Sequence, residues 1–375
     1  MKRIIGSFSG TSVLRACALA TLLAATGGCV CAQENSVSDS TALRVIILPF
    51  QNLSQEAQAK DQVMPRIYEK VESLGWYPVS AETVDVALRR YRIRDTGQIG
   101  WDHAQKLRSE NGSPWILLGS IDLYSSDLLQ VGISARLLNS LTGDLLWADS
   151  RFAAEDETPS LLRSRKIKTA EVLMDDVLKW LFISLRQTWL RGRLAHISES
   201  PVRTSMSARI LIIPFDNVSG SLHADQMVNH VALSALFQQG FDVVEPGLVN
   251  EQARSLGVMP QGQIDLQTLK FLAEHFAADY CLTGSVIHYE LAALPDEGQV
   301  PTIELNVRLL DARRASPIWS DHIRGSGSDY IKIFQLGAVR SPGQLLQRLL
   351  TRVVSSIRKQ LALRNSQVHG LLGNS

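Results

Sequence analysis

Long apolar runs and paired cysteines are both scarce in this sequence of 375 residues. Beyond its first residues, no stretch approaches the roughly 20 consecutive apolar residues that a membrane-spanning helix needs. Three of the four cysteines lie in or beside the start of the chain, which leaves Cys281 alone in the remainder. The sequence therefore predicts neither a transmembrane bundle nor a disulfide framework, and burial of apolar side chains must stabilise the fold.

A strong net charge is also lacking, because 38 Lys and Arg stand against 37 Asp and Glu. This balance excludes the basic footprint of a nucleic-acid-binding protein, so we expect no nucleic acid among the partners. The densest basic run is Arg163-Ser-Arg-Lys-Ile-Lys168, which we interpret as a solvated face at the start of a helix.

Motifs for catalysis or metal binding are missing as well. The eight histidines are scattered, and His223 and His230, seven positions apart, have no third ligand nearby in sequence. Gly97 and Gly100 are followed by neither a Lys-Ser pair nor a dinucleotide fingerprint. Ser120 follows a glycine inside an apolar run, without the spacing of a nucleophile elbow. We therefore predict no enzyme activity, no cofactor and no metal.

The first residues have the pattern of an export signal: a basic start, the apolar run 16–25 and then small residues. Two cleavage sites fit this pattern. Ordinary cleavage would remove 1–32, whereas Thr-Gly-Gly-Cys resembles a lipobox that would remove 1–28 and leave Cys29 lipidated. The mature chain is expected to be exported, and either soluble or held to a membrane by a lipid.

What the sequence does contain is an internal repeat. Arg44-Val-Ile-Ile-Leu-Pro-Phe-Gln-Asn52 recurs as Arg209-Ile-Leu-Ile-Ile-Pro-Phe-Asp-Asn217, 165 positions later. Further on, Trp147-Ala-Asp149 recurs as Trp319-Ser-Asp321 at an offset of 172, so the second copy carries seven extra residues. A repeat of this length defines the length and the boundaries of the structural unit, so it is considered before any local motif.

The repeat predicts two tandem domains. The boundaries that we expect are 42–190 for the first domain, 191–208 for a linker, 209–365 for the second domain and 366–375 for a flexible tail. The linker is rich in serine and contains a proline, as interdomain segments often are.

Each copy follows one order of elements. The first begins with a β-branched apolar strand at 45–48 that a proline stops, as expected for a strand buried on both faces. A helix at 63–74 ends at a glycine, and two further helices follow a second short strand. A three-stranded meander opens at 115–124, and an amphipathic helix at 161–189 closes the unit.

The second copy repeats this order with its strand at 210–213, its first helix at 227–239, its meander from 280–289 and its closing helix at 344–363. The predicted fold class is α/β (α+β): two tandem copies of a mixed-sheet domain with helices packed on the sheet. Trp147 and Trp319 are expected to pack in the core or at the sheet edge.

Two Asn-x-Ser loops recur just past the first strand of each copy, at Asn52, Ser54, Asn217 and Ser219. Ligands of open α/β sheets bind at this end of the strands, so these loops are candidate ligand or partner loops. The alternative is that their side chains hold the turn and cap the next helix. Both interpretations stay open.

Together these motifs resemble a known domain group. The Pro-Phe-x-Asn-x-Ser strand end, the glycine-stopped helix, the Gly-Ser strand and the Arg-Leu-Leu-Asn/Asp…Trp hairpin are similar to the TolB amino-terminal-like domains. That group includes CsgG-like and FlgO-like envelope lipoproteins and LpoB-type activators of peptidoglycan synthases. The resemblance implies a non-catalytic interaction module. Channel-forming relatives need long hairpins, whereas the connections at 122–128 and 288–301 are short and polar, so we expect no pore.

The resemblance and the repeat lead to one favoured function. We expect a non-enzymatic protein-interaction or assembly factor of the bacterial cell envelope, in the periplasm or anchored to the outer membrane by a lipid. Its expected partners are envelope proteins, such as outer-membrane or peptidoglycan assembly machinery, and a homo-oligomer is possible. The alternative is a periplasmic protein that binds or senses a small ligand in a cleft between the two repeats.

Overall fold

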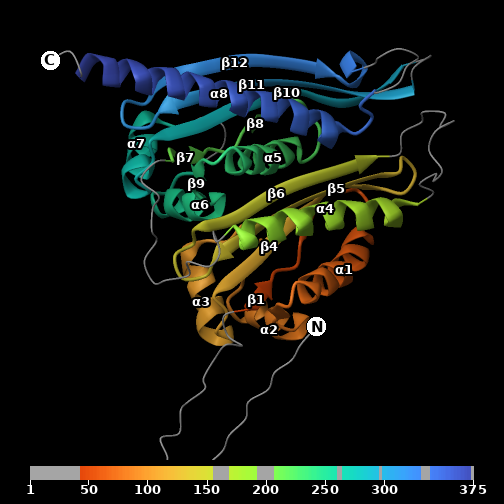
Figure 1. Cartoon of the computed structure of the whole chain (residues 1–375). Helices are drawn as coiled ribbons and strands as arrows, with labels where there is room; N and C mark the ends of the chain where they lie inside the picture. The colour runs from red at the N-terminus through yellow and green to blue at the C-terminus, as the bar shows by residue number, and fades with distance from the viewer. Residues whose placement is uncertain are drawn as a thin grey trace, which may run out of the picture. The chain divides into compact units, whose positions relative to one another are not determined.

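The computed structural model describes residues 43–154, 169–191, 207–259, 264–294, 298–330 and 338–372. All of them belong to one compact unit, Ser38–Ser375. They form two six-stranded mixed sheets of the same topology, one from each sequence copy, as the repeat predicted (Figure 1). The export signal with Cys29, and the basic run 163–168, lie outside the described residues.

The first sheet has the strand order β3-β1-β4-β5-β6, with β2 paired to β4. Its strands are β1 (Arg44–Ile47), β2 (Gln51–Asn52), β3 (Tyr77–Pro78), β4 (Trp115–Ser125), β5 (Gln130–Asn139) and β6 (Leu145–Ala154). Strand β1 lies between β3 and β4 and runs parallel to both, whereas β4, β5 and β6 form an antiparallel meander. Val45, Ile46 and Ile47 are fully buried, which confirms that the apolar run is a central strand.

The described part of the first repeat contains four helices: α1 (Ala59–Ser73), α2 (Ala81–Arg90), α3 (Trp101–Asn111) and α4 (Ala170–Leu190). Side chains of α1 and α4 enter one core with the sheet, and those of α2 and α3 enter a second core on its other face (Figure 1). Helix α1 buries one stripe, including Val63, Ile67 and Val71, and is followed by Gly75 at a φ of 80°. A glycine in this left-handed conformation is a common helix stop.

The second sheet has the strand order β12-β11-β10-β7-β9, with β8 paired to β10. Its strands are β7 (Arg209–Ile212), β8 (Asp216–Asn217), β9 (Asp242–Val243), β10 (Tyr280–Leu294), β11 (Gly298–Asp311) and β12 (Ser316–Ser326). Its helices are α5 (Ala224–Gln238), α6 (Pro246–Ser255), α7 (Leu266–His275), the 3₁₀ turn η1 (Gly327–Tyr330) and α8 (Pro342–Leu372).

Two expectations about the second repeat differ from the structure. Residues 288–294 and 298–301 do not form a connecting loop, because the β10–β11 ladder continues from His288↔Glu304 to Leu294↔Gly298. The seven extra residues therefore lengthen a hairpin. Helix α8 continues to Leu372, past the expected end near Leu363, because no proline or early glycine interrupts its good helix formers.

Both repeats contribute to one hydrophobic core. Helix α5 contacts β10 of its own sheet and also β5 and β6 of the first sheet, and α8 contacts β6 as well. Each fully buried leucine or valine in such a core stabilises the fold by about 1.5–3 kcal/mol. The hairpin tryptophans take part symmetrically: Trp147 Nε1 donates to Ser184 Oγ at 3.2 Å, and Trp319 Nε1 donates to Ser356 Oγ at 3.3 Å. Packing thus joins the two copies into one body.

Candidate functional site

Polar side chains gather where the outer face of the first sheet meets α5. This face is the side of β4, β5 and β6 that points away from α1 and α4. The buried polar cluster consists of Ser120, Asp122, Ser134 and Ser150 from the strands and His230 and Ser234 from α5. Because the members come from both repeats, the cluster exists only when the repeats are packed together.

At the centre of this cluster, His230 Nδ1 lies 3.0 Å from Asp122 Oδ1 and 2.9 Å from Ser120 Oγ. Ser120 also donates to the same carboxylate oxygen at 2.6 Å. A catalytic Ser-His-acid relay uses one ring nitrogen for the acid and the other for the nucleophile. Here both partners share Nδ1, and all three residues are at most 5% exposed. The arrangement is that of a packed polar interface.

The remaining serines extend this network. Ser134 donates to Asp122 Oδ2, Ser134 Oγ lies 2.7 Å from Ser150 Oγ, and Ser150 Oγ lies 2.7 Å from Ser234 Oγ. The Asp122 carboxylate therefore has Ser120, Ser134 and His230 as partners. Buried polar groups that are paired in this way avoid the cost of desolvation without a hydrogen bond.

A buried ion pair lies beside the cluster. Arg136 on β5 contacts Glu245 at 3.0 Å, and the same guanidinium nitrogen donates to the Gly97 carbonyl at 2.5 Å. Glu245 is the N-cap of α6, and its side chain accepts from Gly247 N at 3.4 Å. Arg136 Nε and Glu245 Oε2 have no hydrogen-bond partner among the described residues. A pair of this kind adds little net stability but penalises any other registration of the repeats.

The loop before α3 docks against α6. Gly100, the N-cap of α3, has no side chain to bond the first free amides of the helix. The Glu251 carboxylate from α6 takes that role, accepting from Trp101 N at 2.6 Å and from Asp102 N at 3.3 Å. A negative charge is also favoured at the positive end of the helix dipole. Gly247 touches the Ile99 backbone so closely that a Cβ there would lie 2.3 Å from Ile99 O.

The interface also covers one edge of the first sheet. Three glutamine side chains of the second repeat donate to alternate carbonyls of the edge strand β6: Gln238 to Ala148 at 3.0 Å, Gln347 to Ser150 at 2.9 Å and Gln344 to Phe152 at 3.3 Å. Alternate carbonyls of a strand point the same way, so these bonds occupy groups that another strand would need.

The Asn-x-Ser loops use their side chains locally in both copies. Asn52 Oδ1 accepts from Ser54 N at 3.0 Å and from Ser54 Oγ at 2.7 Å. Asn217 Oδ1 accepts from Ser219 N at 3.2 Å and from Ser219 Oγ at 2.7 Å. Neither loop caps the following helix, since the N-caps Gln58 and His223 make no side-chain cap bond. A ligand role for these four residues stays a prediction.

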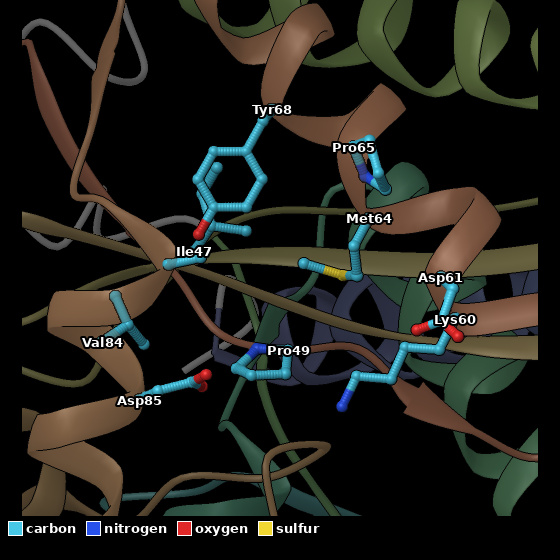
Figure 2. Close-up of a pocket in the computed structure, with 10 residues that line it drawn as sticks. Ile47, Pro49, Lys60, Asp61, Met64, Pro65, Tyr68, Val84 and Asp85 are labelled. Atoms are coloured by element: carbon cyan, nitrogen blue, oxygen red, sulfur yellow. The ribbon is translucent and has the colours of Figure 1, made fainter.

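A pocket of about 300 Å³ lies in the first repeat, between α1 and α2 at the end of β1 (Figure 2). Pro49, Met64, Tyr68 and Val84 contribute apolar surface to it, and Lys60, Asp61 and Asp85 contribute charge. Burial, and to a smaller extent the charge of Asp85, raises the pKa of Tyr68 to about 12. The tyrosine therefore presents a neutral hydroxyl and an aromatic ring to this pocket.

The interface between the repeats was not predicted, although the sequence of α5 contains a signal for it. Helix α1 buries one stripe, whereas α5 buries residues all around its circumference. A helix that is apolar all round must be covered on every side. His230 and Ser234, four positions apart, are the polar residues among those that α5 buries. A comparison of the two first helices would therefore have predicted a partner surface on α5.

No helix in the described parts of the chain combines the length and apolar character needed to cross a membrane. Among the same residues, no three His, Cys, Asp or Glu side chains come together as a candidate metal site.

Comparison with known proteins places the first repeat near a lipoprotein family. Residues 35–181 match the family model described as "Putative lipoprotein GNA1162-like", rather than one named for the TolB amino-terminal-like group. A search of curated proteins finds no match.

Three solved structures show the level of similarity. Lipoprotein GNA1162 from Neisseria meningitidis is 17% identical, and the match covers 40% of this chain and 97% of that chain, with a TM-score of 0.28. The PelC dodecamer from Paraburkholderia phytofirmans is 14% identical over 40% of this chain and 87% of that chain, with a TM-score of 0.27. The LpoB C-terminal domain from Salmonella enterica is 12% identical over 30% and 84%, with a TM-score of 0.26.

Proposed function

We propose that this protein is a non-enzymatic interaction or assembly factor of the bacterial cell envelope, held to the outer membrane by a lipid on Cys29. The observation that carries the proposal is the arrangement of Ser120, Asp122 and His230. These chemically capable side chains are buried at a repeat interface, and the serine and the acid share one ring nitrogen. These side chains hold the two repeats together. The function therefore depends on the exposed surfaces of the two packed repeats.

The compartment is supported by two independent features of the chain. The first is the export signal with its Thr-Gly-Gly-Cys sequence, and the second is the match of residues 35–181 to a lipoprotein family model. Outer-membrane or peptidoglycan assembly machinery is the class of partner that this location makes available.

The interaction role is tested by chemical crosslinking with mass spectrometry in the native envelope. We expect crosslinks between exposed lysines of this chain, such as Lys270 and Lys359, and other polypeptides. The contrary outcome is a chain without intermolecular crosslinks whose melting temperature rises saturably with a small molecule. That outcome would support the ligand-binding alternative and reject the proposal.

The anchor is tested separately by palmitate labelling. The wild-type chain and a Cys31→Ala variant should incorporate label, whereas a Cys29→Ala variant should not. Cys31 is a matched control because it lies two residues from the candidate. Label that persists in Cys29→Ala rejects this cysteine as the anchor.

A further inference from the structure

The interface between the two repeats joins two different surfaces. The other repeat carries an equivalent of each surface, and that equivalent is not covered. One surface is the outer sheet face, which the first repeat presents on β4, β5 and β6. The other is the helix face, which the second repeat presents on α5, α6 and the first turns of α8. A contact between two different surfaces leaves one copy of each surface unpaired. Each unpaired surface can bind the complementary surface of a further molecule.

The uncovered helix face is the α1–α2 pocket. Several of its lining positions correspond, at the 165-residue offset, to positions of α5 and α6 that contact the first repeat. Asp61 corresponds to Gln226, which accepts from Gln51 at 3.2 Å. Asp85 corresponds to Asn250, which donates to Gln98. The pocket is therefore the equivalent, in the first repeat, of the surface of the second repeat on which residues of the first repeat pack.

Two more lining positions agree with this correspondence. Pro65 is the counterpart of His230, which bonds Asp122, and Tyr68 is the counterpart of Leu233, which is 1% exposed. In Figure 2 the side chains of Tyr68, Met64 and Asp85 surround the cavity at the end of β1.

The uncovered sheet face is formed by β10, β11 and β12. It carries Ser285, Glu304, Asn306, Arg308, His322 and Arg324. At the 172-residue offset, Arg308 is the counterpart of Arg136, and His322 is the counterpart of Ser150. Arg136 and Ser150 are buried beneath the second repeat, whereas Arg308 and His322 are exposed. Equivalent positions of the two sheets are therefore covered in the first repeat and exposed in the second.

The two uncovered surfaces carry charges that can pair. The sheet face bears Arg308 and Arg324 together with Glu304 and Glu290, with Glu304 4.0 Å from Arg324, and the pocket bears Asp61 and Asp85 against Lys60. Within the chain, Arg136 reaches Glu245 at the start of α6. The counterpart of Glu245 is Ser80, the N-cap of α2, and Asp85, one turn beyond Ala81, is the acidic residue of α2 that lines the pocket. An arginine on the sheet face and an acid in the pocket can attract each other, which favours the encounter and helps to orient it.

We infer that the sheet face of one molecule docks on the α1–α2 pocket of a second copy of this chain, with Arg308 beside Asp85 and against the Tyr68 ring. The contact repeats between chains the geometry that joins the repeats within a chain. It rests on the proposed interaction function and deepens it by naming the partner as another copy of the same protein.

The test is sedimentation velocity of the full exported chain in detergent, over a range of concentrations and salt. The wild type should form assemblies larger than a monomer, and these should weaken with salt because part of the attraction is between exposed charges. Arg308→Glu and Asp85→Arg should each weaken association by about tenfold or more, and the double variant should recover it. Lys179→Glu, the same type of charge reversal on an exposed residue of α4, should have no effect.

Mixing establishes the head-to-tail geometry. Arg308→Ala and Asp85→Ala chains should each be largely monomeric, but a mixture should form a dimer and nothing larger, because only one complementary contact remains. Both positions are exposed, so unchanged melting temperatures will show that the variants fold. A monomeric wild type, association insensitive to both changes, or a double variant without recovery overturns the inference. If the chain is monomeric but still crosslinks to other envelope proteins, the inference fails and the proposed function stands.

Discussion

Arg136 on strand β5 and Glu245 at the start of α6 form an ion pair at 3.0 Å, with side chains only 2% and 0% exposed. One residue comes from each repeat, so the pair forms only when the repeats are correctly registered. The charges are removed from water and compensated mainly by each other and by the Gly97 carbonyl. Such a pair is sensitive to the loss of either member.

Breaking this pair should be costly. Arg136→Met leaves Glu245 buried without its cation, and we expect a loss of about 3–5 kcal/mol in the free energy of unfolding. The double variant Arg136→Met/Glu245→Gln should lose less, because no uncompensated charge remains. Urea unfolding provides the measurement. Arg66→Met, which removes one member of a pair with the exposed Asp175, is the control and should cost at most about 1 kcal/mol. Equal costs at positions 66 and 136 would contradict the buried-pair account.

Gly247 should tolerate no side chain. A Cβ at this position would lie 2.3 Å from Ile99 O and 2.6 Å from Ile99 N, and both are backbone atoms that cannot move aside cheaply. We expect Gly247→Ala to destabilise the chain by about 1–3 kcal/mol through overpacking at the repeat interface. Ser255→Ala, at an exposed position of the same helix, should change the melting temperature little. A Gly247→Ala variant as stable as wild type would show that the loop does not pack against α6 as described.

Cys281 should be unreactive in the native protein. The side chain is fully buried, and burial raises the pKa of its thiol to about 12, so the nucleophilic thiolate is suppressed near neutral pH. We expect no iodoacetamide adduct on the Cys281 peptide at pH 8 in buffer, and complete modification in urea. Rapid labelling of this peptide without urea would contradict the buried position.

Asp265 should make stability depend on acid pH. Its carboxylate caps α7, accepting from Gln267 N at 3.0 Å and Thr268 N at 2.9 Å, and the hydrogen bond from the Thr268 side chain is the main cause of its lowered pKa. A lowered folded pKa means that the contribution is complete above the usual carboxyl pKa and is lost as pH falls through the folded value.

The matched variant is Asp265→Asn, which keeps a capping oxygen but does not ionise. Its melting temperature should lie below that of wild type at pH 7, and the difference should shrink as pH falls below 4. A difference that is constant from pH 7 to pH 3 would show that the charge of Asp265 makes no contribution.

Much of the fold follows from the sequence because its signals are local. A local pattern indicates each element: the β-branched run at Val45 indicates a strand, Gly75 indicates the end of a helix, and turn residues separate the strands of the meander. The same patterns occur in both copies of the repeat. The packing of the copies is different, because it depends on pairs such as Ser120 and His230 that lie 110 residues apart. Nothing in the local pattern around either residue indicates that the other will cover it.

The β10–β11 hairpin shows a second limit. Polar residues such as His288 and Glu290 suggested a loop, but both lie on one face of a ladder that continues to Leu294↔Gly298. An antiparallel sheet with one solvated face tolerates such residues, so polarity alone does not mark where a strand ends.

Site-specific photo-crosslinking in the native envelope tests whether the α1–α2 pocket binds a protein partner. A photoreactive residue replaces Tyr68 in the α1–α2 pocket or, as a control, Ile183 on α4, which is 44% exposed. Our account predicts that position 68 captures a partner protein, identified as a second copy of this chain, and that position 183 captures none. The absence of any product from position 68, or equal products from both positions, would contradict an interaction function at this pocket.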